Sequence, residues 1–129
     1  MTNQHATTNL DTVENVAPKY GMGDMGEARF FRTALGAERI GMGEYRMNPG
    51  QRTGFGHSHG ESEEIYVILA GSGRFKLGDE IIDVAAKDVV YVPPSVMREW
   101  ESGADGMHML AFGGHADEDN TMETNFWTD

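Results

Sequence analysis

Nine short runs of apolar and β-branched residues, each followed by a turn signal, constrain the fold of this chain most strongly. Glycine, proline and asparagine separate the runs, for example in the Asn48-Pro49-Gly50 segment, and glycine alone makes up 17 of the 129 residues. Short strands that alternate with such turns at regular spacing are typical of an all-β sandwich or barrel. We therefore predict strands at residues 29–34, 40–47, 55–59, 64–70, 74–77, 80–84, 88–92, 98–101 and 107–112.

The charge distribution divides the sequence into a central domain and two arms. The 21 acidic and 10 basic side chains give a net charge of −11, but residues 29–113 carry a net charge of only −3. Residues 1–28 carry −3 and residues 114–129 carry −5, and both segments are poor in aliphatic residues. We therefore expect an N-terminal arm at 1–28, one β-barrel domain at 29–113 and an acidic C-terminal arm at 114–129.

The composition excludes several classes of function. A strongly acidic chain lacks the basic patches that nucleic-acid binding requires, and anionic membrane surfaces repel it. The absence of cysteine excludes disulfides, thiolate metal sites and cysteine nucleophiles. The longest apolar run, at residues 65–70, is too short to span a membrane, and the N-terminus has no signal-peptide pattern. We expect a cytoplasmic protein without a nucleic-acid or membrane partner.

One stretch of the sequence combines side chains that commonly bind metals. His57 and His59 are two residues apart, so on a strand both imidazoles point to the same face. Glu64 opens the next predicted strand and Glu63 precedes it, and by spacing alone either carboxylate could complete the group. Two imidazoles and one carboxylate with open positions suit a divalent transition metal such as Mn, Fe, Ni, Co or Zn. A His-x-His pair on its own also occurs by chance. The glutamates that follow this pair strengthen the prediction of a metal site.

The same stretch resembles the first conserved motif of the cupin superfamily. The resemblance rests on Gly50, on the His57-x-His59 pair, on Glu64 after four further residues and on Gly71 after another six. Downstream, the Gly-rich segment that starts at Gly71 resembles the hairpin after this motif, and the Pro-Pro segment before Ser95 resembles the start of the second motif. The resemblance covers about residues 40–113. It implies a small single-domain cupin whose jelly-roll β-barrel holds ligands inside its mouth.

One position departs from the cupin pattern in a way that bears on the metal. Arg98 stands where the second motif usually supplies a further histidine, and a guanidinium has no free lone pair for a metal. The ligands implied by the resemblance are therefore His57, His59 and Glu64. Arg98 has two open interpretations. It binds an anionic substrate group at the barrel mouth, or it forms a structural salt bridge with Glu99, Glu101 or an acid of the first motif. A pair with the first-motif glutamates 63 or 64 would leave the site without metal.

The remaining candidates concern the walls and the chemistry of the site. By strand periodicity, Trp100 shares a face with Arg98, and Tyr66 shares one with the glutamate of the first motif. Arg98, Tyr66 and Trp100 are therefore the predicted substrate-binding residues. His108 is a candidate for one more metal ligand, and Glu44, Tyr66 and His108 are candidate acid or base groups.

The resemblance leaves two classes of function open. One is a metal-dependent enzyme of isomerase, cyclase or dioxygenase type that acts on a small anionic organic substrate. The other is a non-catalytic protein that binds a small ligand such as a sugar or a carboxylate, with or without a metal. Because the arms of cupins often pack across a partner subunit, the resemblance also implies a homodimer.

Overall fold

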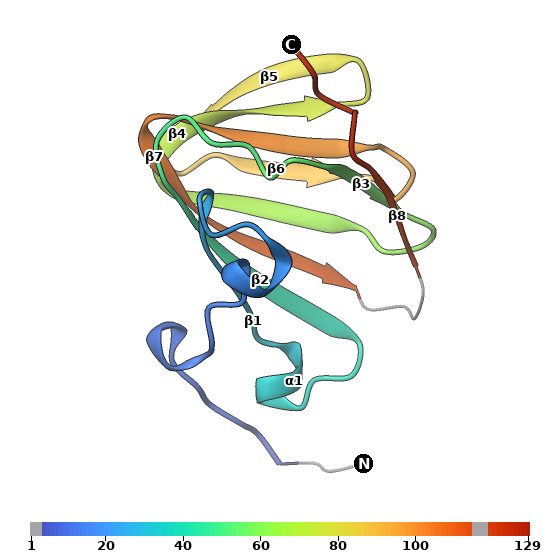
Figure 1. The fold of residues 1–129 in the computed structure, drawn as a ribbon. Coiled ribbons are helices and arrows are strands. Elements are labelled where there is room, and N and C mark those ends of the chain that lie inside the picture. Colours follow the sequence, from blue (N-terminus) through green and yellow to red (C-terminus); the bar gives the residue numbers. More distant parts are fainter. Residues whose placement is uncertain (1–3, 115–118) are drawn as a thin grey trace.

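The computed structural model describes residues 4–114 and 119–129 of the chain. Within these residues, eight strands form one sheet that curls into a barrel, and every strand pairing is antiparallel (Figure 1). The predicted all-β jelly-roll barrel is thus confirmed. In chain order the elements are the 3₁₀ turns η1 (Leu10–Thr12) and η2 (Ala17–Tyr20), β1 (Gly26–Phe30), α1 (Arg32–Leu35), β2 (Ile40–Met47), β3 (Gly56–His59), β4 (Glu64–Leu77), β5 (Glu80–Ala85), β6 (Val89–Val92), β7 (Arg98–Gly114) and β8 (Asn120–Glu123).

Two strands are longer than the sequence predicts. The predicted runs at 64–70 and 74–77 join in β4, and β7 unites the last two predicted runs. The glycines between these runs predict turns, yet they lie where the register between β4 and β7 shifts. Gly71 and Gly106 have φ values of +79° and +76°, and a Cβ at Gly71 would collide with the carbonyl oxygen of Gly106. These glycines therefore bend the strands at bulges instead of ending them.

Alternate residues of β4 and β7 fill the inside of the barrel. Tyr66, Ile68 and Phe75 point inward from β4, Trp100 points inward from β7, and all four are buried. The rings of Tyr66, Phe75 and Trp100 form a cluster whose centroids lie 5.1–5.7 Å apart. The two-residue period of a strand explains this arrangement, because the neighbours of each inward residue face outward. Trp100 also contacts the ring of His57, so the core supports the candidate site directly.

The N-terminal segment packs along β1 at one edge of the sheet. The backbone N–H of Val16 donates to the carbonyl of Ala28 over 2.8 Å, and the side-chain oxygen of Asn15 accepts from the N–H of Ala28 over 3.0 Å. These contacts cover the free edge of β1, which lowers its tendency to pair with other chains. Strand β1 spans the expected boundary between residues 28 and 29, and residues 1–3 of the expected arm lie outside the described ranges.

The end of the first predicted strand is helical. Residues 32–34 belong to α1, and Gly36 follows this helix in the left-handed conformation with a φ of +70°. A glycine in this position commonly ends a helix. The predicted strand at 29–34 is therefore wrong at its end, where the chain forms α1. No helix among the described residues has the length and apolar composition needed to cross a membrane.

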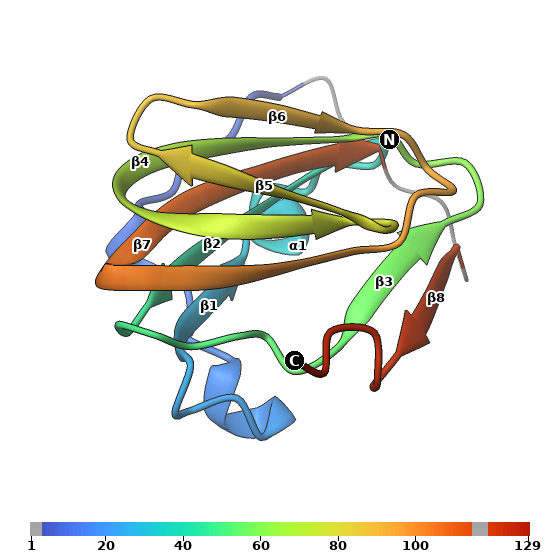
Figure 2. The ribbon, with the colours of Figure 1, turned by 90° about the horizontal axis from the view of Figure 1, so that it is seen from above.

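The C-terminal residues dock against the barrel in two places. Strand β8 pairs with β3 and lies beside it, as the two views in Figures 1 and 2 show. Further along, the guanidinium of Arg52 lies 4.2 Å from the centroid of the Trp127 ring, and Lys76 donates to the carbonyl of Phe126 over 2.6 Å. This part of the expected acidic arm is therefore built into the fold. Residues 115–118 of the arm lie outside the part of the chain that the structure describes.

Candidate metal centre

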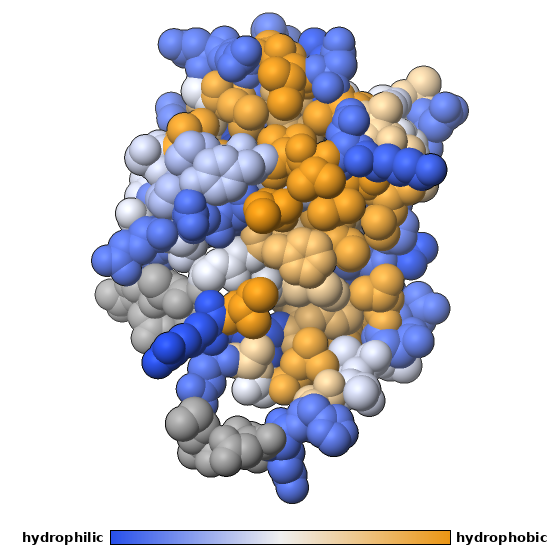
Figure 3. Space-filling view, turned by 180° about the vertical axis from the view of Figure 1, so that it is seen from behind, coloured by the Kyte–Doolittle hydropathy of each residue, from blue (hydrophilic) through white to orange (hydrophobic). Residues whose placement is uncertain are grey.

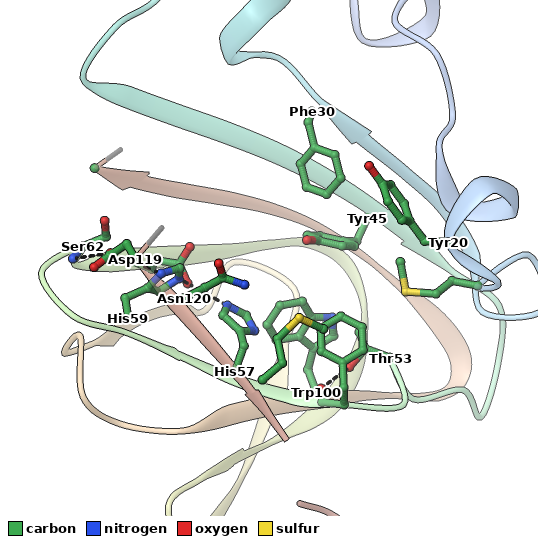
Figure 4. A pocket seen from close by; sticks show the side chains of 15 residues that line it. Tyr20, Phe30, Tyr45, Thr53, His57, His59, Ser62, Trp100, Asp119 and Asn120 are labelled. Carbon is green, nitrogen blue, oxygen red and sulfur yellow. Dashed lines mark hydrogen bonds and ion pairs between the residues drawn. The ribbon is translucent and has the colours of Figure 1, made fainter. Parts of the chain in front are cut away.

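Strands β3 and β4 bring three potential metal ligands together. His57 and His59 alternate on β3 and line the same pocket (Figure 4). Glu64 begins β4, and its Oε1 lies 3.3 Å from the Nε2 atom of each histidine. One ligand atom from each of the three residues lies within 4.8 Å of the others. Glu63, the alternative carboxylate, instead accepts a hydrogen bond of 2.5 Å from the hydroxyl of Tyr91.

The distances from Glu64 to the two histidines fit a single bound ion. Imidazole nitrogens and carboxylate oxygens bind transition metals at about 2.0–2.2 Å, so two ligands at neighbouring positions lie about 3.0–3.4 Å apart. The distances of 3.3 Å from Glu64 to His57 and His59 fall in that range. Both ring nitrogens of His59 are buried, and neither makes a hydrogen bond with a described residue. Burial lowers the pKa of His59, which favours the neutral imidazole that a metal requires.

Glu64 supplies a negative charge to this group. Burial by itself raises the pKa of the Glu64 carboxyl, but hydrogen bonds from His57 and from the hydroxyl of Tyr66 outweigh burial and lower it to about 2. The carboxylate is therefore ionised at neutral pH. An ionised carboxylate and two imidazoles are the donor set that Mn, Fe, Co, Ni and Zn accept in proteins. The residues present thus fit a divalent transition metal.

Arg98 lies behind this carboxylate, outside the pocket. It pairs with His57 across β7 and β3, and its Nη1 donates to Oε1 of Glu64 over 2.6 Å. The side chain is fully buried, and its other donors bind the backbone carbonyls of Val96 and Pro93 at 2.9 and 2.8 Å. Of the two interpretations of Arg98, the structure contains the ion pair with the first-motif glutamate. The guanidinium is not placed to hold an anionic substrate group, because the barrel wall already supplies its acceptors.

The other two predicted substrate-binding residues have different positions. Trp100 lines the pocket, and its ring lies edge-on to His57 at a centroid distance of 5.8 Å. Tyr66 is fully buried beneath Glu64, donates its hydroxyl proton to that carboxylate and does not line the pocket. Trp100 is thus a pocket wall, whereas Tyr66 supports the carboxylate from below.

The candidate acid and base groups outside the motif do not face the pocket. His108 Nε2 lies 2.7 Å from Oε2 of Glu44, and both residues lie on the outward face of the sheet formed by β2 and β7. Neither residue lines the pocket that holds His57 and His59. His108 is therefore not placed to act as a further metal ligand. Strand periodicity explains this, because Met109 and Tyr45, their neighbours in sequence, face the interior.

The pocket above the histidines is large and mostly apolar. It encloses about 690 Å³, which is in the usual range for small-molecule sites. Figure 4 shows aromatic side chains from several elements around it, with the histidines on one side. No lysine or arginine occurs among the lining residues in the described ranges, which are Tyr20, Met22, Phe30, Tyr45, Thr53, Phe55, His57, His59, Ser62, Glu64, Trp100, Gly114, Asp119, Asn120 and Met122.

Asp119 is a site residue that sequence reasoning missed. Its Oδ1 accepts backbone hydrogen bonds from Gly60 and Glu61 at 2.8 and 2.9 Å, and Oδ2 accepts one from Ser62 at 3.1 Å. Oδ2 also lies 3.4 Å from Nδ1 of His59. Hydrogen bonds from Ser62 and from the backbone N–H groups of Gly60 and Glu61 lower the Asp119 pKa to about 2, so this group is a carboxylate at neutral pH. In the sequence Asp119 is one acid in a run of acids, 60 residues from His59, and no local signal singles it out.

A comparison with models of known protein families identifies the family of this chain. The model of the cupin domain matches residues 43–111, which is more than half of the chain. The chain belongs to the cupin family. The matched region of this cupin includes His57, His59, Glu64 and Arg98, so the whole candidate centre apart from Asp119 lies inside it.

Solved structures show the same fold at low sequence identity. A cupin protein from Bacteroides fragilis is 22% identical, has a TM-score of 0.71 and covers 92% of this chain and 89% of its own. Oxalate decarboxylase from Bacillus subtilis is 20% identical with a TM-score of 0.77, and the match covers 94% of this chain but 32% of that enzyme.

An uncharacterized protein from Methanocaldococcus jannaschii is 41% identical over 46 residues. That match spans 36% of this cupin and little more than a third of the curated relative.

Proposed function

We propose that this cupin binds one divalent transition metal through His57, His59 and Glu64 and uses it to hold an oxygen atom of a small organic ligand. The convergence of these three donors at the base of an apolar pocket supports the proposal most directly. Mn, Fe, Ni, Co and Zn are the candidate ions, since all of them accept nitrogen and oxygen ligands. When bound, such an ion supplies Lewis-acid polarisation of a carbonyl or enolate oxygen, or a site for dioxygen.

The protein's own groups hold this donor set in place. Tyr66 fixes the orientation of the Glu64 carboxylate from below through a hydrogen bond to Oε1. Asp119 lies on the far side of the His59 ring, where a carboxylate orients a ligating imidazole and increases its basicity. The apolar walls lower the local dielectric constant, which strengthens electrostatic interactions at the base of the pocket.

The lining favours a ligand with an apolar body. Phe30, Phe55 and Trp100 contribute aromatic surface, and Thr53 and Asn120 contribute polar atoms for orientation. With no cationic side chain among the described lining residues, a negative charge on the ligand would be balanced by the metal alone. A compact dianion such as oxalate would leave most of the apolar surface uncovered. We therefore do not propose oxalate as the ligand, although the fold is similar to that of oxalate decarboxylase.

A second candidate function is non-catalytic binding of a small ligand such as a sugar or carboxylate. One observation favours it: the candidate acid and base groups Glu44, Tyr66 and His108 do not line the pocket. Asp119 does line it, but three backbone hydrogen bonds hold its carboxylate. An experiment can distinguish an enzyme from a binding protein. A candidate ligand is incubated with the metal-loaded protein, and chromatography shows whether the ligand is converted to a product.

Metal content tests the proposal directly. Untagged protein purified without chelator and reloaded with Mn, Fe, Co, Ni or Zn should hold about one equivalent by elemental analysis. His57→Ala should reduce the content to below about a tenth of an equivalent, because a two-ligand site binds these ions weakly. His5→Ala is the matched control, since His5 is exposed and far from β3 in the sequence, and it should retain the metal. Less than about a tenth of an equivalent in the reloaded wild type would refute the metal site.

Asp119→Asn should weaken metal binding without removing a ligand. Loss of a carboxylate partner from a ligating histidine costs about 10- to 100-fold in metal affinity. A competition titration against a chromophoric chelator measures this change. Glu123→Gln, an exposed acid on β8, is the matched control and should bind as the wild type does. Equal affinities of the Asp119→Asn variant and the wild type would show that this carboxylate only supports the loop.

A further inference from the structure

A second cavity adjoins the pocket above the histidines. It encloses about 250 Å³ and shares His59 and Glu64 with the larger pocket, so the two cavities adjoin at the donor set. We call this second cavity the side branch. At the volume of liquid water it corresponds to about eight water molecules, which is room for one functional group and a short chain. Unlike the larger pocket, the side branch has an arginine, Arg32, in its lining.

Small residues on the inward side of β7 and β2 create this space. Glu64 pairs with Gly113 of β7, and Gly113 pairs with Gly41 of β2. Because alternate residues of a strand share a face, Gly43 and Ala111 are the next inward pair. A Cβ atom at Gly113 would lie 3.0 Å from Cγ of Glu64. The absence of larger side chains therefore leaves a path from Glu64 across β7 and β2 towards β1, a span of about 14 Å at the usual spacing of strands.

Arg32 lies at the β1 end of this path. The backbone N–H of Phe31 donates to the carbonyl of Met42 over 3.0 Å and holds the start of α1 beside β2. Arg32 is partly buried, and its Nη1 donates to the carbonyl of Ala37 over 3.3 Å. In the described ranges its guanidinium makes no ion pair and no other hydrogen bond.

An arginine without an acid partner is unusual in this chain, which has 21 acidic and 10 basic side chains. The other arginines of the described residues, apart from the exposed Arg39, pair with acids: Arg29, Arg46, Arg52, Arg74 and Arg98. Because charges that are withdrawn from water are usually paired, the guanidinium of Arg32 is suited to an anion from outside the chain.

We propose that the side branch holds the carboxylate of an organic acid, with Arg32 as its partner. This inference rests on the proposed function, in which an oxygen atom of the same ligand faces the metal. A guanidinium binds a carboxylate through two parallel hydrogen bonds. A negative charge in the larger pocket would meet only the metal, whereas a carboxylate in the side branch meets Arg32. The ligand is thus an acid whose apolar body fills the larger pocket and whose carboxylate extends towards β1.

The groups around the side branch are compatible with a carboxylate. Glu64 also lines it, but the ion pair with Arg98 offsets the charge of this glutamate. Tyr45 lines both cavities, its hydroxyl has no hydrogen-bond partner among the described residues, and in Figure 4 this hydroxyl points towards the side of the histidines. It is available as a further donor. Arg32 thus takes the role of binding an anionic substrate group that the sequence suggests for Arg98.

The outward side of the same strands is a separate surface. Exposed apolar residues such as Ile65 and Val89 lie there, and Figure 3 shows hydrophobic side chains gathered on the back of the molecule. Arg39 lines a different hollow together with Ile65 and Tyr91, and it does not line the side branch. Arg39 is therefore a suitable control arginine.

Binding of phenyl-substituted acids tests the proposal. Straight-chain acids that carry a terminal phenyl group and a methylene chain of increasing length are each compared with the uncharged primary amide by ligand-observed NMR titration of the full chain. The wild type should bind at least one acid about tenfold more tightly than its amide, because the amide loses a charge-assisted pair of hydrogen bonds. Arg32→Gln should weaken binding of that acid about tenfold and leave binding of the amide unchanged. Arg39→Gln should bind both as the wild type does.

Three outcomes would overturn the proposal. They are the absence of acid binding by the wild type at about 10 mM, equal affinities of the wild type for every acid and its amide, and equal affinities of the wild type and Arg32→Gln for every acid. Unchanged binding of the amide shows that the variant is folded, so a loss of acid binding is not a loss of structure.

Metal content separates this inference from the proposed function. Arg32→Gln should load as much metal as the wild type, since Arg32 is not one of the donors. The titrations are therefore run on metal-free and on metal-loaded protein. An acid preference that depends on Arg32 in a chain that takes up no metal would support the side branch and refute the metal site. A chain that loads metal but shows no such preference would refute the side branch alone.

Discussion

Replacing Arg98 with alanine is expected to lower the free energy of unfolding by about 3–5 kcal/mol, the usual effect of breaking a buried ion pair. Arg98 is fully buried, and its removal deprives the Glu64 carboxylate of its cationic partner and the carbonyls of Val96 and Pro93 of this donor. Urea denaturation of the metal-free protein measures the change. Lys19→Ala is a contrasting control, because the Lys19–Glu14 ion pair is 62% exposed on both sides and should contribute less than about 1 kcal/mol.

The same substitution should strengthen metal binding. In the wild type the Arg98 guanidinium lies 2.6 Å from the oxygen that would face the metal, and the two cations compete for one carboxylate. Removal of the competing charge should raise metal affinity at least about tenfold. Added metal should consequently raise the midpoint of denaturation more in Arg98→Ala than in the wild type. Equal or smaller stabilisation of the variant would show that Arg98 supports metal binding instead of opposing it.

Replacing Trp127 with alanine should loosen the C-terminal segment and thereby weaken the distant metal centre. The Trp127 ring is buried between Arg52 and Arg74, at 4.2 and 5.2 Å from their guanidinium carbons, and loss of a buried tryptophan typically costs about 3–5 kcal/mol. When this anchor is lost, Asp119 is held less firmly against His59. We expect metal affinity to fall about 10- to 100-fold, although Trp127 does not line the pocket.

Two measurements separate this coupling from general unfolding. Limited proteolysis followed by mass spectrometry should show new cleavage after residue 114 in the Trp127→Ala variant, and a chelator competition should report the metal affinity. Trp127→Phe keeps an aromatic ring over Arg52 and should behave like the wild type. Faster cleavage together with an unchanged metal affinity would contradict a role of the segment in the site.

The histidines and the glutamate of the site were predictable because they lie close together in sequence. The two-residue period of a strand places His57 and His59 on one face, and a short connection brings in Glu64. Asp119 was not predictable, because its approach to His59 depends on β8 pairing with β3 across 60 residues. The position of the Arg98 guanidinium was also beyond sequence reasoning. Strand periodicity predicts which face of the sheet a residue lies on. The hydrogen-bond partners of a long side chain depend on which other segments pack around it in the fold.

The fold shows the same division between local and distant information. The strand content follows from alternating residues, and the jelly-roll barrel was predicted correctly. The continuity of β4 and β7 was not predicted, since Gly71 and Gly106 give the same sequence signal in a turn and in a bulge. Only their pairing partners across the sheet distinguish the two structures.

The central position of β7 also has a consequence for the order of folding. This strand pairs with β2, β3 and β4, so its residues 98–114 join segments made much earlier during synthesis. Such distant pairings slow the folding of β-proteins to milliseconds or seconds. Until β7 leaves the ribosome, the edges of β2 and β4 that it later covers have no partner, and they can associate with other nascent chains. A chain shortened before β7 would therefore be prone to aggregate, whereas a chain shortened after residue 114 would keep the β7 pairings but lose β8 and the carboxylate beside His59.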